Sequence, residues 1–173
     1  MLRAKELRKI REDISNTSRP TWQSRLPRDF GSPSHGKLKA DVWRTCIEFD
    51  LPVSLADLWS GNDDNGDTSS MAAREKTVME STMFLSMAIR WGTSYRTSAV
   101  HARSYKQHMH AYLKTLLKLF PNRQLHPIHH NAIHFAECLL AFGPCHGWWM
   151  FPFERLIGML QRINTNSRIG ECP

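Results

Sequence analysis

The fold is decided by the stretch "TSAVHARSYKQHMHAYLKTLLKLF", residues 97–120. Large apolar side chains recur there every three or four residues, the spacing of one helix face, namely Tyr105, Met109, Tyr112, Leu116 and Phe120. A second face repeats basic side chains and a histidine, namely Arg103, Lys106, His110, Lys114 and Lys118. Pro121 ends the pattern, because proline cannot continue a helix. The stretch therefore predicts an amphipathic helix over residues 97–119, apolar on one face and positively charged on the other.

The same spacing of apolar residues predicts helices along most of the chain. The other predicted helices span residues 2–15, 39–49, 52–59, 71–91, 129–142 and 152–163. Pro52 suits the first turn of the helix over 52–59, and Gly143 followed by Pro144 ends the helix over 129–142. No segment alternates apolar and polar residues as a half-buried strand does. The fold class we expect is therefore mainly α, with about six helices packed as an irregular bundle.

Length and composition place these helices in a chain of one domain's size. The chain has 173 residues, of which 41% are hydrophobic, and this is enough to bury a core. Three regions differ in composition: a basic N-terminal helix (1–19), a Pro/Gly/Ser-rich connector (20–38) and a helical domain (39–173). The helical domain contains an acidic loop at residues 60–70.

The balance of charge points to a polyanionic partner. The net charge is +7, which suits nucleic acid first, and no aspartate or glutamate occurs between Arg90 and Arg123. The candidate DNA-binding residues are Arg90, Arg96, Arg103, Lys106, Lys114, Lys118 and Arg123, together with Arg155 and Arg162 further along the chain. The alternative is a solvated helix face without a ligand, and charge alone does not separate the two.

Histidines are concentrated in "LHPIHHNAIHF", residues 125–135. His130 and His134 are four residues apart and would share a helix face, as a pair of zinc ligands does. Cys138 or Glu137 is the candidate third ligand for a Zn²⁺ ion. The alternative is that these histidines only form hydrogen bonds, and without an HExxH motif the spacing leaves both interpretations open.

Several other kinds of site and segment are not expected. The acidic loop begins like an EF-hand calcium loop, but Thr68 and Arg74 stand where a glycine and a glutamate are required. Residues 135–153 are apolar, but glycines, prolines and a glutamate interrupt them, so we expect no membrane-spanning helix. The charged N-terminus carries no secretory signal. Four scattered cysteines without a CxxC pair indicate reduced thiols inside the cell.

An acidic residue follows an aromatic run in "GWWMFPFERLIGMLQR", residues 147–162. If Pro152 is the first residue of a helix, Glu154 lies in the first turn, where a carboxylate is stabilised by unpaired amides and the helix dipole. Gly158 follows one turn later, and a glycine inside a helix suggests that another group approaches that face closely. Glu154 is therefore either a helix cap or a carboxylate kept for chemistry.

Three stretches resemble the C-terminal part of CACTA (En/Spm) superfamily transposases, above all fungal members and related Plavaka-type elements. They are "FGSPSHGKLKADVWR" (30–44), "LPVSLADLW" (51–59) and "FGPCHGWWMFPFERLIGMLQRINTNSRIGE" (142–171). The third stretch also resembles a plant transposon-derived domain with a "WMYPFER" core. The similarity covers residues 20–171, and its long C-terminal block is the most specific part.

The resemblance implies a DDE-type parent enzyme with an RNase H-like core, in which two aspartates and a glutamate hold two Mg²⁺ ions for DNA cleavage. By position, Glu154 is the candidate third carboxylate. The present chain resembles the helical insertion and the C-terminal end of such an enzyme. The strands that carry the two aspartates lie upstream in the family, whereas Asp29 and Asp41 occupy loop and helix contexts.

The chain is accordingly expected to be a catalytically incomplete fragment, with no nuclease activity and no cofactor of its own. The expected partners are DNA, bound electrostatically without sequence specificity, and a full-length transposase, with no membrane. Such a fragment is expected inside the cell, in the nucleus. The alternatives are a non-catalytic, histidine-dependent metal-binding protein and an inactive transposon relic.

Overall fold

The computed structural model describes residues 3–21, 23, 25–32, 38–59 and 69–163. Its elements in chain order are α1 (Ala4–Asn16), α2 (Ala40–Thr45), η2 (Cys46–Asp50), α3 (Leu51–Trp59), α4 (Ser69–Gly92), α5 (Ala99–Leu119), α6 (Pro127–Phe142), η3 (Cys145–Gly147) and α7 (Phe151–Leu160). Every element within those ranges is helical. The predicted mainly α fold class is therefore confirmed.

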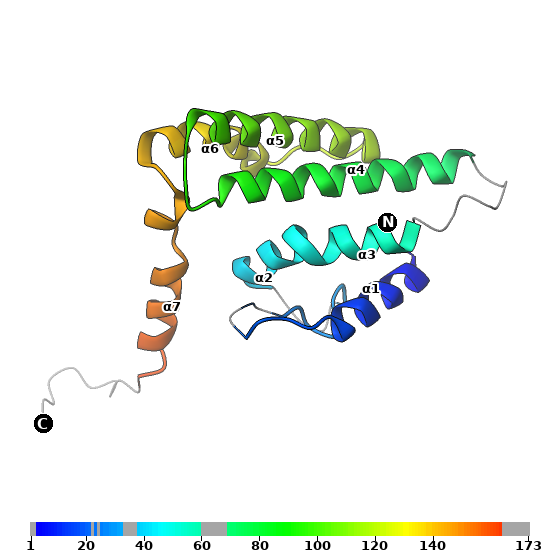
Figure 1. The fold of residues 1–173 in the computed structure, drawn as a ribbon, viewed down its shortest axis with the longest axis horizontal. Helices are drawn as coiled ribbons and strands as arrows, with labels where there is room; N and C mark the ends of the chain where they lie inside the picture. Colours follow the sequence, from blue (N-terminus) through cyan, green and yellow to red (C-terminus); the bar gives the residue numbers. More distant parts are fainter. Residues whose placement is uncertain (1–2, 22, 24, 33–37, 60–68, 164–173) are drawn as a thin grey trace, which may run out of the picture.

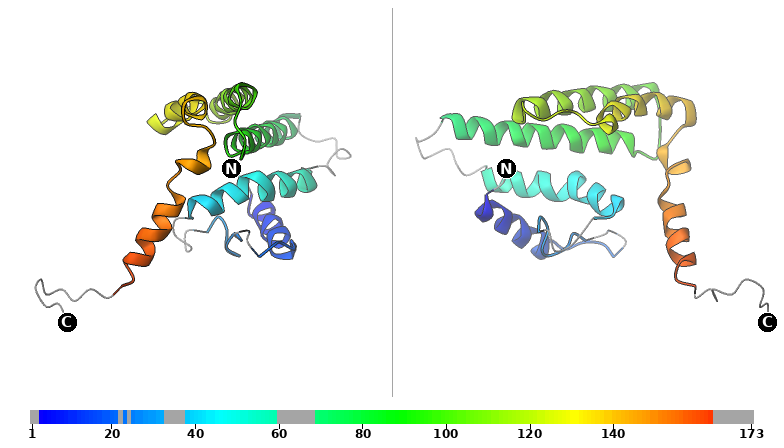
Figure 2. Two further views of the ribbon diagram at one scale, coloured as in Figure 1. Left: turned by 60° about the vertical axis from the view of Figure 1, so that its left-hand side comes forward. Right: turned by 180° about the vertical axis from the view of Figure 1, so that it is seen from behind.

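The helices form two layers and one projection (Figure 1). Helices α4, α5 and α6 lie along one another in one layer, and α1 packs against α3 in the other. The layers meet where η2 and α3 contact α4. Helix α7 projects from one end of the molecule, away from both layers, in all three ribbon views (Figure 2).

The core of the first layer forms between α4, α5 and α6. Its buried side chains are Ala88, Ala102, Tyr105, Met109, Leu113, Ala136, Leu139 and Cys145. The Tyr105 hydroxyl donates a hydrogen bond to the Ala132 carbonyl at 2.8 Å and so joins α5 to α6. Gly92 lets α4 end against the Tyr105 ring, because a Cβ atom there would lie 2.9 Å from Tyr105 Cδ2.

The second core lies between α1, the stretch after it, and the helices over 40–59. Its buried side chains are Ile10, Ile14, Leu26, Phe30, Cys46 and Leu55. Leu26 and Phe30 belong to the Pro/Gly/Ser-rich stretch 20–38, which therefore supplies part of this core. The Arg19 guanidinium pairs with both carboxylate oxygens of Asp50, and both side chains are 1% exposed. This ion pair ties the end of the α1 segment to η2.

The sequence predicted one helix over 39–49 and a separate one over 52–59. This prediction is wrong, because α2, η2 and α3 follow one another without a break and form one continuous helical rod. Proline removes a backbone donor and crowds the preceding turn. The chain absorbs Pro52 with a π-helical turn just before it, in which the Leu51 N–H bonds to the Cys46 carbonyl. The Ser86 hydroxyl of α4 donates to the Glu48 carbonyl at 3.5 Å, next to the site where the proline supplies no N–H.

Most of the other predicted boundaries agree with the structure to within about three residues. Helix α6 begins at Pro127 rather than residue 129 because His126 forms its cap, with the His126 N–H donating to His129 Nδ1 at 2.9 Å. The predicted acidic loop at 60–70 falls mainly on residues 60–68, which lie outside the described residues, and α4 already begins at Ser69.

Candidate nucleic-acid interface

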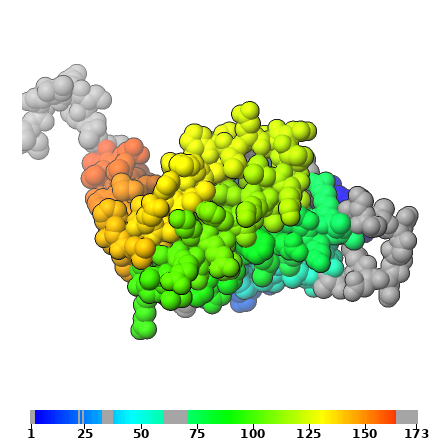
Figure 3. All heavy atoms as spheres, turned by 90° about the horizontal axis from the view of Figure 1, so that it is seen from above, coloured from blue at the N-terminus to red at the C-terminus, as the bar shows by residue number. Residues whose placement is uncertain are grey.

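Helix α5 presents one face to the protein and the opposite face to solvent. The helix begins after Ser98, whose Oγ accepts a hydrogen bond from the His101 N–H at 3.2 Å. Tyr105, Met109 and Leu113 point into the core of the first layer. As the sequence pattern predicted, the basic residues lie on the exposed outer side of α5. Figure 3 shows the molecule from the side on which α5 and α6 lie.

The outer face of α5 carries a shallow groove with a basic lining. The groove is lined by Arg103, Lys106, Gln107, His110, Ala111 and Lys114. From residue 103 to residue 114 a helix advances about 16 Å, a length over which one strand of DNA carries about five phosphates. We call Arg103, Lys106, His110 and Lys114 the basic row.

Most cations of the basic row keep their charge unneutralised. Lys106 Nζ lies 3.8 Å from Glu137 Oε1 on α6, and both side chains are substantially exposed. Within the described residues, neither Arg103 nor Lys114 forms an ion pair. An exposed pair such as that of Lys106 contributes little, so the row as a whole is available to a polyanion.

The other predicted DNA-binding residues do not join this groove. Lys118, one turn beyond Lys114, borders a separate hollow next to α4. Arg90, Arg96, Arg123, Arg155 and Arg162 are exposed, with Arg155 on the projecting helix α7 and Arg162 just after it. The structure therefore brings together three of the nine predicted residues, and His110 completes the row.

Two basic side chains of the N-terminal helix form contacts within the protein. Lys9 Nζ lies 2.9 Å from Asp13 Oδ1 and 3.4 Å from Asp57 Oδ2. Arg11 Nε donates to the Phe30 carbonyl at 2.8 Å. These side chains hold α1 against its neighbours, so α1 is a poorer candidate for phosphate binding than α5.

Glu154 is exposed in the first turn of α7. The position fits the helix-cap interpretation, in which a carboxylate near the helix start is favoured by the dipole. Within the described residues, no group of three His, Cys, Asp or Glu side chains is placed to hold a metal ion. The role of Glu154 as a catalytic carboxylate remains a prediction.

Helix α7 leaves its apolar face uncovered by the rest of the described chain. Phe153, Leu156, Ile157 and Leu160 are each about half exposed. A Cβ atom at Gly158 would find no described atom within 4 Å. The close approach that the glycine suggested is therefore absent from the described part of the chain.

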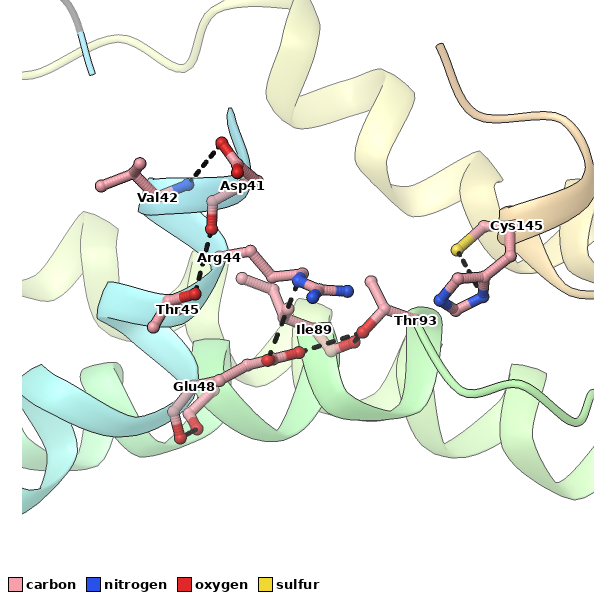
Figure 4. A network of polar contacts seen from close by, with 10 residues as sticks. Asp41, Val42, Arg44, Thr45, Glu48, Ile89, Thr93 and Cys145 are labelled. Atoms are coloured by element: carbon pink, nitrogen blue, oxygen red, sulfur yellow. Dashed lines mark hydrogen bonds and ion pairs between the residues drawn. The ribbon is translucent and has the colours of Figure 1, made fainter. Parts of the chain in front are cut away.

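The base of α7 is fixed by an aromatic stack that sequence reasoning missed. The His146 ring stacks on Tyr95 with centroids 3.9 Å apart and touches Trp149 at 4.1 Å. The Arg44 guanidinium lies 5.6 Å from the centre of the Trp149 ring. Glu48 lies between Arg44 and Thr93, accepting from Thr93 Oγ1 at 3.0 Å (Figure 4). No short-range pattern in the sequence marked Arg44 or Glu48 as partners of the aromatic run.

The two predicted metal-ligating histidines converge on α6. His134 Nε2 lies 3.1 Å from His130 Nε2, and His134 Nδ1 lies 3.1 Å from Glu137 Oε2. Glu137, considered as a third ligand, thus contacts the far side of the His134 ring. His126 and His129, from the same histidine-rich stretch, form the cap of α6 instead.

Comparisons with known proteins add no relatives. No family model, no curated protein and no solved structure matches the chain. Among the helices that the structure describes, none is both long and apolar enough to cross a membrane.

Proposed function

We propose that the chain is a transposase-derived helical module that binds double-stranded DNA through the basic row of α5 and does not cleave it by itself. The observation that carries the proposal is the groove on α5 whose lining includes Arg103, Lys106, His110 and Lys114. The transposase origin is supported by the resemblance of residues 20–171 to CACTA-type enzymes.

Electrostatics favours a nucleic acid over a small anion. A single phosphate or carboxylate would contact one or two of these side chains, whereas the row repeats cations along about 16 Å of helix. A phosphate backbone can contact several of them at once and release a counterion at each. Because the contacts go to phosphates rather than to base edges, the binding is expected to be independent of sequence.

Cleavage is not assigned to the isolated chain. Two-metal phosphodiester chemistry needs several carboxylates around the two ions. Glu154 is instead exposed at the start of α7. A complete site would need carboxylates supplied by another chain, such as the full-length transposase.

The salt dependence of binding tests the proposal. We expect the chain to bind a duplex of arbitrary sequence with a plot of log K against log [salt] whose slope is about −3, since each phosphate contact contributes about −0.9. Affinity should fall about fiftyfold between 50 and 200 mM salt. Binding that does not weaken over this range would contradict an electrostatic interface.

A charge-matched pair of triple variants locates the interface. Replacing Arg103, Lys106 and Lys114 by alanine should reduce the steepness of the salt slope by about 3, because three phosphate contacts are lost. Replacing Arg25, Arg28 and Lys39, which are also exposed, removes the same net charge from elsewhere and should leave most of the slope. Equal effects of the two variants would show that only net charge matters and would overturn the assignment to α5.

A further inference from the structure

The geometry points to a binding site for a divalent transition-metal ion on α6, formed by His130 Nε2 and His134 Nε2 and oriented by Glu137. The site lies on α6, outside the groove on α5, although Lys106 of the basic row also contacts Glu137. Its basis is that the two Nε2 atoms face each other across a single turn, 3.1 Å apart. Sharing a helix face does not by itself bring two ring nitrogens together, so this convergence is additional to the i, i+4 spacing.

The separation of the two nitrogens matches that of two ligands on one ion. With metal–nitrogen bonds of about 2.0–2.1 Å, two ligands at a right angle lie about 2.9 Å apart, and two at the tetrahedral angle lie about 3.4 Å apart. The observed 3.1 Å lies between these limits. An ion can therefore bind both nitrogens once the two rings turn their Nε2 lone pairs toward one point.

Glu137 selects the tautomer that a metal needs on His134. A carboxylate can only accept, so His134 Nδ1 carries the proton and donates it to Glu137 Oε2 at 3.1 Å. The Nε2 lone pair of His134 is thereby free for His130 Nε2–H or for an ion. A ligand histidine whose other nitrogen donates to a carboxylate is the usual arrangement around zinc. Lys106 Nζ, 3.8 Å from the other Glu137 oxygen, keeps that carboxylate in place.

When an ion binds, the proton on His130 Nε2 moves to Nδ1 through solvent, so both Nε2 lone pairs become ligands and no net proton is released from the neutral rings. The His134 and Glu137 side chains are 52% and 61% exposed, which leaves room for water on the remaining coordination positions. Imidazole nitrogen suits Zn²⁺, Ni²⁺ and Cu²⁺, whereas Mg²⁺ and Ca²⁺ prefer oxygen. The site is therefore selective for the first group.

Calorimetric titration of the full chain with ZnCl₂ and with NiCl₂ tests the assignment. We expect one saturable site for each metal and none for MgCl₂. His134→Ala should weaken the tightest site at least tenfold, and Glu137→Gln should weaken it by about 10–100-fold. His110→Ala, which removes an exposed histidine from α5, should leave that site within twofold of the original affinity.

Three results would overturn the inference. The first is the absence of Zn²⁺ and Ni²⁺ binding, and the second is equal binding by the His134→Ala and His110→Ala variants. The third is an unchanged affinity in Glu137→Gln, which would remove the orienting role of the carboxylate. Because all three positions are exposed, we expect the variants to have similar thermal unfolding temperatures. Similar temperatures would show that a loss of metal affinity does not come from unfolding.

Discussion

At the scale of single residues, the most consequential interaction is the buried ion pair of Arg19 and Asp50. Burial raises the pKa of the Asp50 carboxyl, while the Arg19 guanidinium opposes that rise. Arg19 is one of several arginines in residues 1–28, and only the fold of the stretch after α1 singles it out. Sequence reasoning therefore treated it as one basic residue among many.

Removing one partner of this pair should destabilise the protein strongly. Arg19→Ala leaves the Asp50 charge buried alone, and we expect the free energy of unfolding to fall by about 3–5 kcal/mol. Arg25→Ala, at an exposed position, should change it by less than about 0.5 kcal/mol. Urea unfolding measures both. The double replacement Arg19→Met with Asp50→Leu should cost less than Arg19→Ala alone, and a larger cost would contradict the role assigned to the pair.

His146 is a second residue whose environment determines its behaviour. Burial lowers the pKa of the imidazole, and the nearby Arg44 charge lowers it further, against a smaller opposing effect of Glu48. His146 Nε2 is buried without a hydrogen-bond partner in the described part of the chain. The folded state therefore favours the neutral ring.

This preference predicts acid-sensitive stability. The unfolded chain takes up the His146 proton near the ordinary pKa of about 6.5, and the folded chain takes it up only at lower pH. The contribution is thus fully present above pH 6.5 and is lost as pH falls through 6.5 toward the folded pKa. His146→Phe should reduce the drop in unfolding temperature between pH 7.5 and pH 5. An equal drop in both proteins would contradict the prediction.

At the scale of elements, the spacing of apolar residues predicted the features that depend on residues close together in the sequence. It did not predict the features that depend on contacts between distant residues. The two faces of α5 follow directly from the spacing of Tyr105, Met109 and Lys114, because a single helix needs only a buried and an exposed side. The continuous rod over 40–59 did not follow, since a π-turn that absorbs Pro52 depends on packing against α4. The position of α7 outside both layers is likewise a property of the whole chain.

Two glycines on different helices should respond differently to the same substitution. Gly92→Ala would place a Cβ atom 2.9 Å from Tyr105 Cδ2 and 3.2 Å from Phe135 Cε1, and overpacking of this kind costs about 1–3 kcal/mol. Gly158→Ala meets open space in the described structure and improves helix propensity by up to about 1 kcal/mol. Urea unfolding should show a loss for the first variant and none for the second. A loss at Gly158 would indicate that something covers α7.

At the scale of the whole molecule, one face of α5 packs into the core of the first layer and the opposite, basic face is exposed. Helix α4 packs against η2 and α3 on one side and against α5 on the other, and α6 also packs against α5, so only the remaining face of α5 is open to solvent. The net charge of +7 predicts a polyanionic partner, but it does not show which cations share a groove. Of the predicted candidates, Arg103, Lys106 and Lys114 share a groove because they repeat at helical spacing on α5, whereas Lys118 borders a separate hollow one turn further on. Those on α4, α7 and the turns were separated by the tertiary fold.

The most direct test of the central claim is to map DNA contacts by NMR on the isotope-labelled full chain of 20.0 kDa. On addition of a short duplex at about 50 mM salt, we predict that amide shifts concentrate on the exposed face of α5 between Arg103 and Lys114 and fade at about 200 mM salt. Shifts confined to α1 or α7, with the α5 resonances unmoved, would contradict the account.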